Sequence, residues 1–260
     1  MQNYDVVIKS HPKDYYKLPY VIDSLKYLEP QFDNIYLVSL DGHVPQCLFT
    51  DKIIPVKDSE VAPFIDKTRF NYRYNWCWVN MLSITQEFTK NDLYLDVQAD
   101  NIFLNKVELF NEDGRPRLFK TSANMANNNE WGPYFTFSRS MFGLNKITYG
   151  SSYIIEFMLY DKKKLSKLYE NYSSKQEMIE KSYGLVSDES YPADQEIYGN
   201  LIERDFSEDY EIVGPVETHL TGKFSSNDET QELLKYIEEI KSKSPAALAC
   251  SYHTYWLPDE

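Results

Sequence analysis

The sequence contains few cysteines, and none of them forms a pair at metal-binding or redox spacing. The three, Cys47, Cys77 and Cys250, are odd in number and far apart in a chain of 260 residues. A CxxC pair would indicate a zinc or redox site, and an even set of closely spaced cysteines would indicate a disulfide framework. The sequence has neither, so we expect no zinc centre, no disulfide framework and a reducing compartment.

Long apolar runs are also missing. No stretch approaches the roughly 20 residues that a membrane-spanning helix requires. The N-terminal segment Met1-Gln2-Asn3-Tyr4-Asp5 leads directly into a strand-like run, without the basic stretch and apolar core of a signal peptide. These features predict a cytoplasmic protein without a membrane span.

Basic residues are outnumbered by acidic ones. The chain has 27 Lys and Arg against 40 Asp and Glu, which gives a formal net charge of −13. Such a surface repels nucleic acids and anionic lipids, so we expect neither as a partner. A phosphate-bearing ligand would need local Arg or Lys side chains or a bound cation. Aromatic residues are plentiful, with 22 Tyr, 14 Phe and 4 Trp, and such side chains suit stacking against sugars.

The first forty residues have the pattern of a strand–helix–strand unit. Residues 5–8 form an apolar run typical of a buried parallel strand, and residues 35–39 form a second one. Between them, apolar residues recur at three- and four-residue spacing from Leu18 to Leu28, which predicts a helix with Pro19 in its first turn. The whole unit has the length of one right-handed crossover between parallel strands.

The rest of the chain alternates helical and strand-like segments. Helices are predicted over residues 74–88 and 193–202, and strands over residues 153–160 and 246–250. Irregular structure is predicted over residues 43–70, and loops, with a hairpin as an alternative, over residues 111–150. Leu233 and Leu234 belong to the predicted buried face of a last helix, which follows a capping box at Ser226. Since there are no repeats or low-complexity linkers, we predict one α/β domain with a mostly parallel, twisted sheet flanked by helices.

Two carboxylates lie where one strand-like run gives way to the next. Asp96 and Asp100 fall within residues 91–104, in which two apolar pieces flank a polar break. Carboxylates at the end of a buried strand can coordinate a hard divalent cation, and the cation can neutralise a diphosphate leaving group. The alternative is a solvated turn, because Asp is common in turns. On spacing alone, the turn is the more frequent outcome.

Five segments together carry a resemblance to a known family. In chain order they are Ile8-Lys9-Ser10-His11-Pro12-Lys13-Asp14, Arg69 with Tyr74-Asn75-Trp76, Gln98-Ala99-Asp100, Glu156-Phe157-Met158-Leu159-Tyr160-Asp161 and Asp194-Gln195-Glu196-Ile197-Tyr198-Gly199. The third segment resembles the DxD region of GT-A-type glycosyltransferases, and the order of all five resembles a poorly characterised group of GT-A-like proteins. The resemblance implies a GT-A-like fold over residues 1–260, with a nucleotide-binding part at about 1–110 and an acceptor-side part at about 111–260.

The resemblance also implies an activity and a cofactor. The activity is transfer of a sugar from a nucleoside diphosphate sugar, such as a UDP-sugar, to a hydroxyl of a glycan, protein or small-molecule acceptor. The cofactor is Mn²⁺ or Mg²⁺, held by Asp100 with His253 or His219 as a further ligand. Gln98 stands where the family has the first Asp of DxD. It can hydrogen-bond a hydroxyl but brings no negative charge, for which Asp96, two residues earlier on the same strand face, could compensate.

Candidates for the nucleotide lie at predicted strand ends. His11 follows the first strand, at the edge where α/β sheets bind ligands. The resemblance implies that Ser10 and His11 lie near the base or ribose, although His11 could instead cap the next helix. Asp41 ends the second strand at the same edge and is a weaker candidate.

Three basic residues are candidates for the diphosphate. Arg69 and Arg73 are four residues apart, a spacing that on a helix places two side chains on one face. From there both could reach a diphosphate, although exposed arginines are usually only solvated. Lys223, in the segment that also holds His219, could meet a phosphate.

Acidic residues near the predicted helix at 193–202 are candidates for catalysis. In an inverting reaction, Asp194 or Glu196 could take the proton of the acceptor hydroxyl, and in a retaining one Glu156 could face the sugar. The alternative is that acids at a helix N-terminus only favour the helix dipole. Trp131 and Tyr134 could form a sugar platform, and core packing is an equal alternative for them.

Two other functions remain open at this point. A catalytically degenerate GT-A-like module that binds a sugar or a protein would account for Gln98. A nucleotidyltransferase would share the strand-end carboxylates, but it usually has a glycine-rich basic loop near the N-terminus. Residues 9–14 contain no glycine, so this function ranks last.

Overall fold

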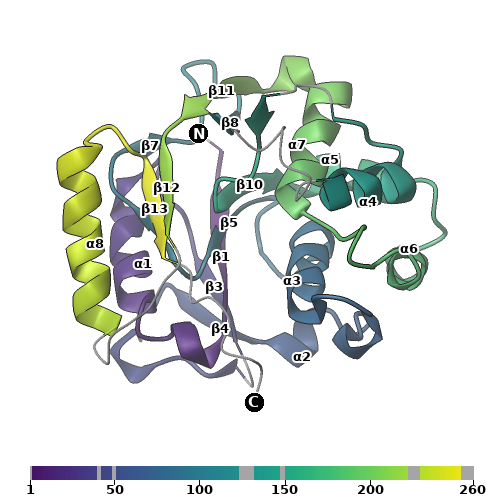
Figure 1. Cartoon of the computed structure of the whole chain (residues 1–260), viewed down its shortest axis with the longest axis horizontal. Coiled ribbons are helices and arrows are strands. Elements are labelled where there is room, and N and C mark those ends of the chain that lie inside the picture. Colours follow the sequence, from purple (N-terminus) through teal and green to yellow (C-terminus); the bar gives the residue numbers. More distant parts are fainter. Residues whose placement is uncertain are drawn as a thin grey trace.

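A five-stranded sheet forms the centre of the chain, in a computed structural model that describes residues 2–39, 42–48, 51–122, 132–146, 150–221 and 229–252. The strand order is β10-β5-β1-β3-β4 (Figure 1). The strands are β1 (Tyr4–Ser10), β3 (Ile35–Ser39), β4 (Ile53–Lys57), β5 (Leu93–Gln98) and β10 (Phe157–Asp161).

The sheet is mostly parallel. Strand β1 pairs in parallel with β3 and β5, and β4 pairs in parallel with β3. Only β10 is antiparallel, on the outer side of β5. The carboxyl ends of the four parallel strands therefore lie at one edge, and β10 begins at the same edge.

The strand order reverses beside β1. From β1 the chain proceeds to β3 and β4, and it then returns to the other side of β1 to form β5. In open α/β sheets, ligands bind outside the carboxyl ends of the strands at such a switch point. The topology thus points to the ends of β1 and β5, at Ser10 and Gln98, as the place for a ligand.

Helices cover both faces of the sheet, which confirms the predicted α/β architecture. On one face lie α1 (Leu18–Ser24) and α8 (Glu229–Lys243), to the left in Figure 1. The larger group, to the right, consists of α3 (Tyr74–Thr85), α4 (Gly132–Phe142), α5 (Lys162–Leu165), α6 (Lys175–Tyr183) and α7 (Asp194–Asp205). The short helix α2 (Asp58–Val61) follows β4.

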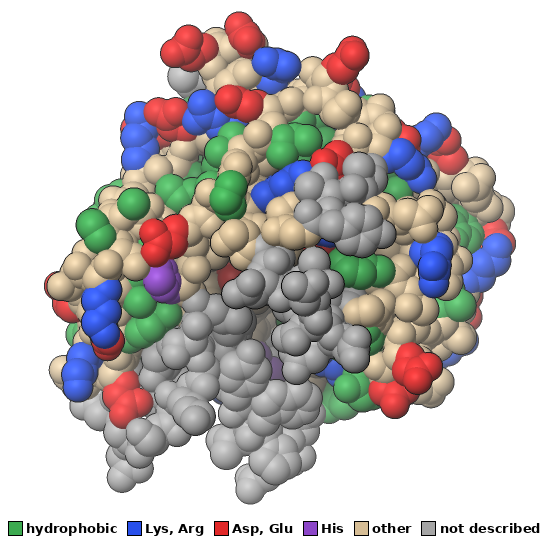
Figure 2. All heavy atoms as spheres, turned by 45° about the horizontal axis from the view of Figure 1, so that its top comes forward, with side chains coloured by type: hydrophobic (Ala, Val, Ile, Leu, Met, Phe, Trp, Pro, Cys, Tyr) green, Lys and Arg blue, Asp and Glu red, His purple; other side chains and the backbone are tan. Residues whose placement is uncertain are grey.

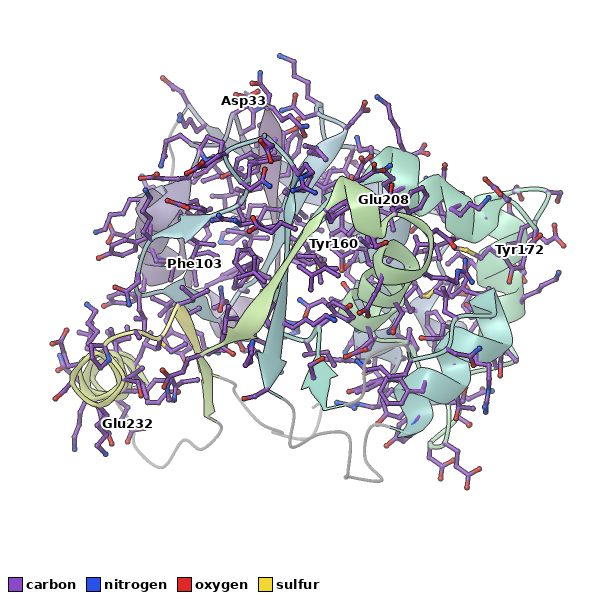
Figure 3. All side chains as sticks on the ribbon, turned by 90° about the horizontal axis from the view of Figure 1, so that it is seen from above. Asp33, Phe103, Tyr160, Tyr172, Glu208 and Glu232 are labelled. Carbon is purple, nitrogen blue, oxygen red and sulfur yellow. The ribbon has the colours of Figure 1, made fainter. Side chains whose placement is uncertain are left out.

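The two layers have separate hydrophobic cores because side chains alternate along each strand. Ile8 and Val97 face the core under α1 and α8, and Val7 and Tyr94 face the core under α3 and α7. Phe103 belongs to the core under α1 and α8, and Tyr160 belongs to the core under α3 and α7; both residues are labelled in Figure 3. Polar residues on the second face of β1 and β5 are therefore directed at α3 and α7.

Small sheets extend the central one. The turn after β5 leads into β6 (Asn101–Phe103), which pairs antiparallel with β13 (Ala249–Tyr252), and β13 pairs in parallel with β12 (Thr218–Thr221). The C-terminal part of the described chain is thereby fixed next to the turn that holds Asp100. The remaining small sheets are formed by β11 (Glu211–Val216), β8 (Arg117–Ser122) and β9 (Ser151–Ser152), and by β2 (Leu28–Glu29) with β7 (Val107–Glu108).

Three predictions of local structure are wrong. Residues 43–70 contain the strand β4, in which Pro55 is tolerated because β4 is an edge strand. Residues 111–150 contain the helix α4 as well as the strand β8, whereas loops or a hairpin were expected there. Leu234 is 37% exposed, since only Leu233 and its neighbours one turn further on face the sheet.

The structure bears on two expectations from the composition, the absence of a membrane-spanning helix and the excess of negative charge. No helix among the described residues is long and apolar enough to span a bilayer. Acidic and basic side chains are interspersed over the face in Figure 2, so the negative charge is not gathered into one patch there.

Candidate functional site

The candidate site lies at the carboxyl ends of β1 and β5. Strand register places Lys9 opposite Gln98, so the ends of both strands lie side by side. Ser10, the last residue of β1, is half-buried. The exposed His11 accepts a hydrogen bond at Nδ1 from the backbone N–H of Lys13 (3.3 Å) and so caps the short 3₁₀ helix Pro12–Asp14. His11 therefore caps the helix that follows it, which was the alternative to a role in nucleotide binding.

The turn between β5 and β6 adds Asp100 to this edge. Gln98 and Asp100 are both half-buried, and the Oδ1 atom of Asp100 is shielded from solvent. The backbone N–H of Gln98 donates to the carbonyl of Glu156 (3.1 Å), which precedes β10. Gln98, Asp100 and Glu156 therefore lie at the same edge of the sheet.

Glu156 has an unusual backbone conformation. Its φ is +69°, in the left-handed region that residues other than glycine rarely adopt. The side-chain oxygen Oε1 of Gln195, on α7, accepts a hydrogen bond from the N–H of Ile155 (3.0 Å). Strained residues persist where the surroundings fix them, and they cluster at functional sites. Glu156 therefore remains a candidate to face a bound sugar.

A buried polar cluster lies behind the edge. The Nζ atom of Lys9 contacts the Oδ2 atom of Asp96 and the hydroxyl of Ser83 on α3, and 6% of the Lys9 and Asp96 side chains is exposed. Asp96 shares a strand face with Gln98, as expected, but its charge is neutralised by Lys9. The geometry gives Asp96 an ion pair rather than an open position for a metal ion.

Asp194 joins this cluster from the first turn of α7. Its backbone N–H donates to the Oδ1 atom of Asn80 on α3 (2.8 Å), and its own Oδ1 atom accepts from the N–H of Gln195 (2.9 Å). Burial raises the pKa of Asp194 above its ordinary value, the neighbouring Lys9 opposes this rise, and Asp96 adds to it. The residue as a whole is only half-buried. A half-buried carboxyl with a raised pKa near the switch point of the sheet is a candidate for proton transfer.

Glu196, two residues further along α7, has a different environment. Its side chain is 1% exposed. The carboxylate accepts hydrogen bonds from the Ser152 hydroxyl (2.7 Å), the Tyr153 N–H (3.0 Å), the Asn200 side-chain amide (3.1 Å) and the Lys146 ammonium (2.8 Å). Residues two apart on a helix do not face each other, so Glu196 points away from the Asp194 cluster. Four donors leave this carboxylate arranged as a structural ion pair.

The two arginines do not share a helical face, which corrects that expectation. Arg69 ends the 3₁₀ helix Lys67–Arg69, pairs with Glu180 (2.7 Å) and lies over the Tyr183 ring (4.2 Å). Arg73 precedes the first residue of α3 and has a left-handed φ of 45°. The two residues are not on one helix, because the 3₁₀ helix ends at Arg69 and α3 begins only at Tyr74.

Five further expectations concern a residue in the C-terminal half and residues outside the described part of the chain. His219 lies on β12 and shares a hydrogen bond of 2.8 Å with Glu217. Strand β13 separates it from β6, which places it two strand spacings, about 10 Å, from the strand that follows Asp100. Asp41, Lys223 and His253 lie outside the described residues, as does Trp131.

Asp100 could hold a divalent cation only in part. Among the described residues, no group of three or more His, Cys, Asp or Glu side chains could hold a metal ion. Mg²⁺ is commonly bound by one or two carboxylates together with substrate phosphates and water. A half-buried carboxylate at the switch point, with Asp96 already paired, fits that kind of shared site and does not fit a cage of protein ligands.

One groove lies elsewhere. It has a volume of about 640 Å³ and is lined by Lys163, Ser166, Lys167, Glu170, Arg204, Asp205 and Phe206. These residues follow β10 or end α7, so the groove lies at the amino edge of the parallel strands, away from Asp100. Its charges are largely paired internally, with Arg204 on Asp205 (2.7 Å) and Lys167 on Glu170 (2.7 Å).

Several residues of the cluster were missed by sequence reasoning. Lys9 lies on β1, and Asn80 and Ser83 lie on α3, and none of the three was assigned a role from the sequence. The available signal was Lys9 itself, since a lysine within an apolar strand needs a buried partner. Its partner could not be named without the pairing of β1 with β5.

Comparisons with known proteins give a general likeness of fold. No protein-family model matches the sequence, and no curated protein sequence does. The structure is similar to those of two glycosyltransferases. One is the galactosyltransferase LgtC in complex with donor and acceptor sugar analogues, with 9% identity, 96% of this chain and 87% of that chain covered, and a TM-score of 0.47. The other is GlyE of Streptococcus pneumoniae TIGR4, with 13% identity, coverage of 100% and 57%, and a TM-score of 0.42.

Proposed function

We propose that the chain is a glycosyltransferase that transfers a sugar from a nucleoside diphosphate sugar, with UDP-sugars as the first donors to test, to an acceptor hydroxyl. The observation that carries the proposal is the meeting of the Gln98-Ala99-Asp100 turn with Ser10 at the switch point of the sheet. That position is where α/β sheets bind nucleotides. The sequence resemblance around these segments supports the same function.

The donor would be bound by residues at the strand ends. Ser10 and His11 would contact the base or ribose, and the side-chain amide of Gln98 would hydrogen-bond a sugar or ribose hydroxyl. Asp100 would share Mn²⁺ or Mg²⁺ with the diphosphate oxygens. The cation, when bound, supplies positive charge that stabilises the diphosphate as a leaving group. This cation answers the need for positive charge in a chain of net charge −13.

Asp194 is the proposed base for an inverting reaction. Its carboxylate would accept the proton of the acceptor hydroxyl while the hydroxyl oxygen forms a bond to the anomeric carbon and the bond from that carbon to the diphosphate breaks. A carboxyl with a raised pKa is a better proton acceptor than an ordinary one, which suits the role. In a retaining reaction, Glu156 would face the sugar instead.

Calorimetric titration with UDP and Mn²⁺ tests the donor site. The wild type should bind UDP–Mn²⁺, Asp100→Ala should bind it at least about tenfold more weakly, and Asp113→Ala should bind it like the wild type. Asp113 is a suitable control because its side chain is 77% exposed and lies in a distant turn. Equal binding by the wild type and Asp100→Ala would show the site assignment to be wrong.

A second candidate is a binding module without catalysis. Gln98, which lacks the charge of the family's first Asp, favours it. The two functions differ in whether UDP is released from UDP-sugars in the presence of Mn²⁺. Release that is lost in Asp194→Asn supports the transferase, and binding of UDP without any release supports the module.

A further inference from the structure

Aromatic rings surround one guanidinium group at the start of α3. The Arg73 guanidinium lies 4.9 Å from the ring centroid of Trp76 and 5.2 Å from that of Tyr191. The Tyr191 ring meets the Tyr134 ring edge to face (4.9 Å) and contacts Tyr72 (5.4 Å). We call these five residues the Arg73 cluster. Contacts of a cation with ring faces hold the guanidinium in place without neutralising its charge.

Most other described arginines have carboxylate partners. Arg69 pairs with Glu180, Arg117 with Glu108 and Glu211, and Arg204 with Asp205. Within the described part of the chain, no carboxylate oxygen lies within 4.0 Å of the Arg73 guanidinium. In a strongly acidic protein, an arginine held by rings instead of acids retains positive charge for an anion from outside.

The backbone of Arg73 is also unusual. Its φ of 45° and ψ of 48° are left-handed, and it occupies the position before α3 without capping the helix by its side chain. Such a conformation is uncommon for a residue with a side chain. Together with Glu156, Arg73 is one of two residues other than glycine with positive φ among those described. The strain indicates that the location of this side chain matters.

The Arg73 cluster adjoins the candidate base. The Trp76 indole N–H donates to the carbonyl of Pro192 (2.9 Å), two residues before Asp194. One turn further along α3, Asn80 accepts from the N–H of Asp194 (2.8 Å). The cluster and Asp194 thus lie where the N-terminal half of α3 meets the start of α7, whereas Asp100 lies in the turn after β5.

Exposed tyrosines precede and follow Arg73 in the chain. Tyr72 is 38% exposed and Tyr74 is 40% exposed, and only Ile212 and Leu234 are comparable among the described large hydrophobic residues. The faces of tyrosine rings suit the C–H surface of a sugar ring, and their hydroxyls remain in water. Arg73, the residue between them in the chain, adds a planar pair of donors for a carboxylate or phosphate.

We propose that the Arg73 cluster is an acceptor subsite for a sugar that carries an anionic group, a carboxylate or a phosphate. The proposal rests on the transferase function above, and it names the acceptor chemistry that the sequence left open. Arg73 would bind the anionic group, and Tyr72 and Tyr74 would contact the ring of the sugar. The acceptor hydroxyl would then lie toward Asp194.

Binding of three monosaccharide probes tests this subsite. Methyl β-glucuronide, glucose 6-phosphate and methyl β-glucoside are titrated separately, with fluorescence or NMR signals of Trp76 as the readout. The wild type should bind at least one of the anionic probes about tenfold more tightly than the neutral one, since the guanidinium contact is charge-assisted. Whichever of the two anionic probes binds more tightly identifies the preferred anionic group as a carboxylate or a phosphate.

Two variants and one control make the test specific. Arg73→Gln removes the charge, and Arg73→Gly removes it with a residue that suits the left-handed backbone, so at least the second should fold. Both should lose the preference for anionic probes and keep the affinity for UDP–Mn²⁺. Arg139→Gln, at an exposed arginine on α4 that is likewise without an ion pair among the described residues, should keep both.

The outcomes separate the two proposals. Absence of an anionic preference in the wild type, or its persistence in Arg73→Gly, overturns the acceptor subsite. Weaker UDP–Mn²⁺ binding by the Arg73 variants also overturns it, because Arg73 would then contact the donor diphosphate. Failure of the wild type to bind UDP–Mn²⁺ counts against the transferase function alone, since binding of the anionic sugar is measured without nucleotide.

Discussion

The ammonium group of Lys9 contacts the carboxylate of Asp96 in the interior of the protein, with 6% of each side chain exposed. The two residues come from neighbouring parallel strands, and Asp194 adds a second carboxylate to the same cluster. One ammonium group therefore serves two acids. Removal of the ammonium should be far more harmful than removal of a lysine from the surface.

Lys9→Met should lower the free energy of unfolding by about 3–5 kcal/mol, because it leaves buried carboxylate charge without its partner. Urea denaturation followed by circular dichroism measures the change. Lys26→Met is the matched control, since Lys26 pairs with Asp23 at the surface, with 57% and 72% of the side chains exposed. The control should unfold like the wild type. A Lys9→Met protein as stable as the wild type would contradict the importance of this pair.

Asp194→Asn should increase stability at neutral pH and reduce transfer. Because the pKa of Asp194 is raised in the folded state, ionisation costs more in the folded protein than in the unfolded chain. The cost is fully present above the folded pKa and vanishes below the unfolded pKa of about 3.9. The gain from Asn should therefore be largest at neutral pH and shrink as the pH falls through the folded pKa.

Urea midpoints of the wild type and Asp194→Asn, measured across this pH range, test the prediction. UDP release from a UDP-sugar gives the second readout, and it should fall in the variant if Asp194 is the base. A variant that is less stable than the wild type at neutral pH would show that the hydrogen bonds of the carboxylate outweigh the effect of burial.

Glu196→Gln should destabilise the protein without changing nucleotide affinity. The substitution keeps the shape of the side chain but leaves the Lys146 ammonium, whose side chain is 4% exposed, without a charged partner. A loss of about 3 kcal/mol or more is expected from such a broken pair. UDP–Mn²⁺ affinity of the folded variant should match the wild type. Unchanged stability with lost transfer would instead give Glu196 a catalytic role.

Gly199→Ala should destabilise the protein because α7 packs closely on Tyr153. A Cβ atom at position 199 would lie 2.2 Å from the Cγ atom of Tyr153, a ring that is fully buried. Overpacking of this kind typically costs about 1–3 kcal/mol. Gly184→Ala is the control, since its Cβ would lie 3.8 Å from the Lys181 carbonyl oxygen, an ordinary contact. Thermal unfolding should show a lower midpoint for the first variant only.

Local pattern was sufficient for several elements of the fold. The strand predicted over residues 35–39 coincides with β3, and the apolar pieces around Asp100 are β5 and β6. Their apolar runs are continuous and bounded by polar turns, so the signal lies in adjacent residues. Strand β4 was missed because Pro55 indicates a break locally, although an edge strand accommodates it.

Some residues of the candidate site could likewise be placed from local pattern, and others could not. Asp100 and Gln98 could be placed at a strand end from the sequence, because the turn between two apolar runs is a local feature. The roles of Asp96, Asp194 and Glu196 could not be separated, since all three are acids near predicted element ends. Asp96 is paired with a lysine 87 positions earlier, and Glu196 with one 50 positions earlier.

The sequence by itself determined the first strand–helix–strand unit and the turn that presents Asp100, because those depend on the periodicity of neighbouring residues. Only the tertiary structure decided which acids are neutralised and which lie at the carboxyl edge of the sheet, and that Arg73 is held by aromatic rings. Burial and ion pairing depend on residues that meet only when β1, β5, α3 and α7 pack together. Their effects on charge and pKa therefore arise with the fold.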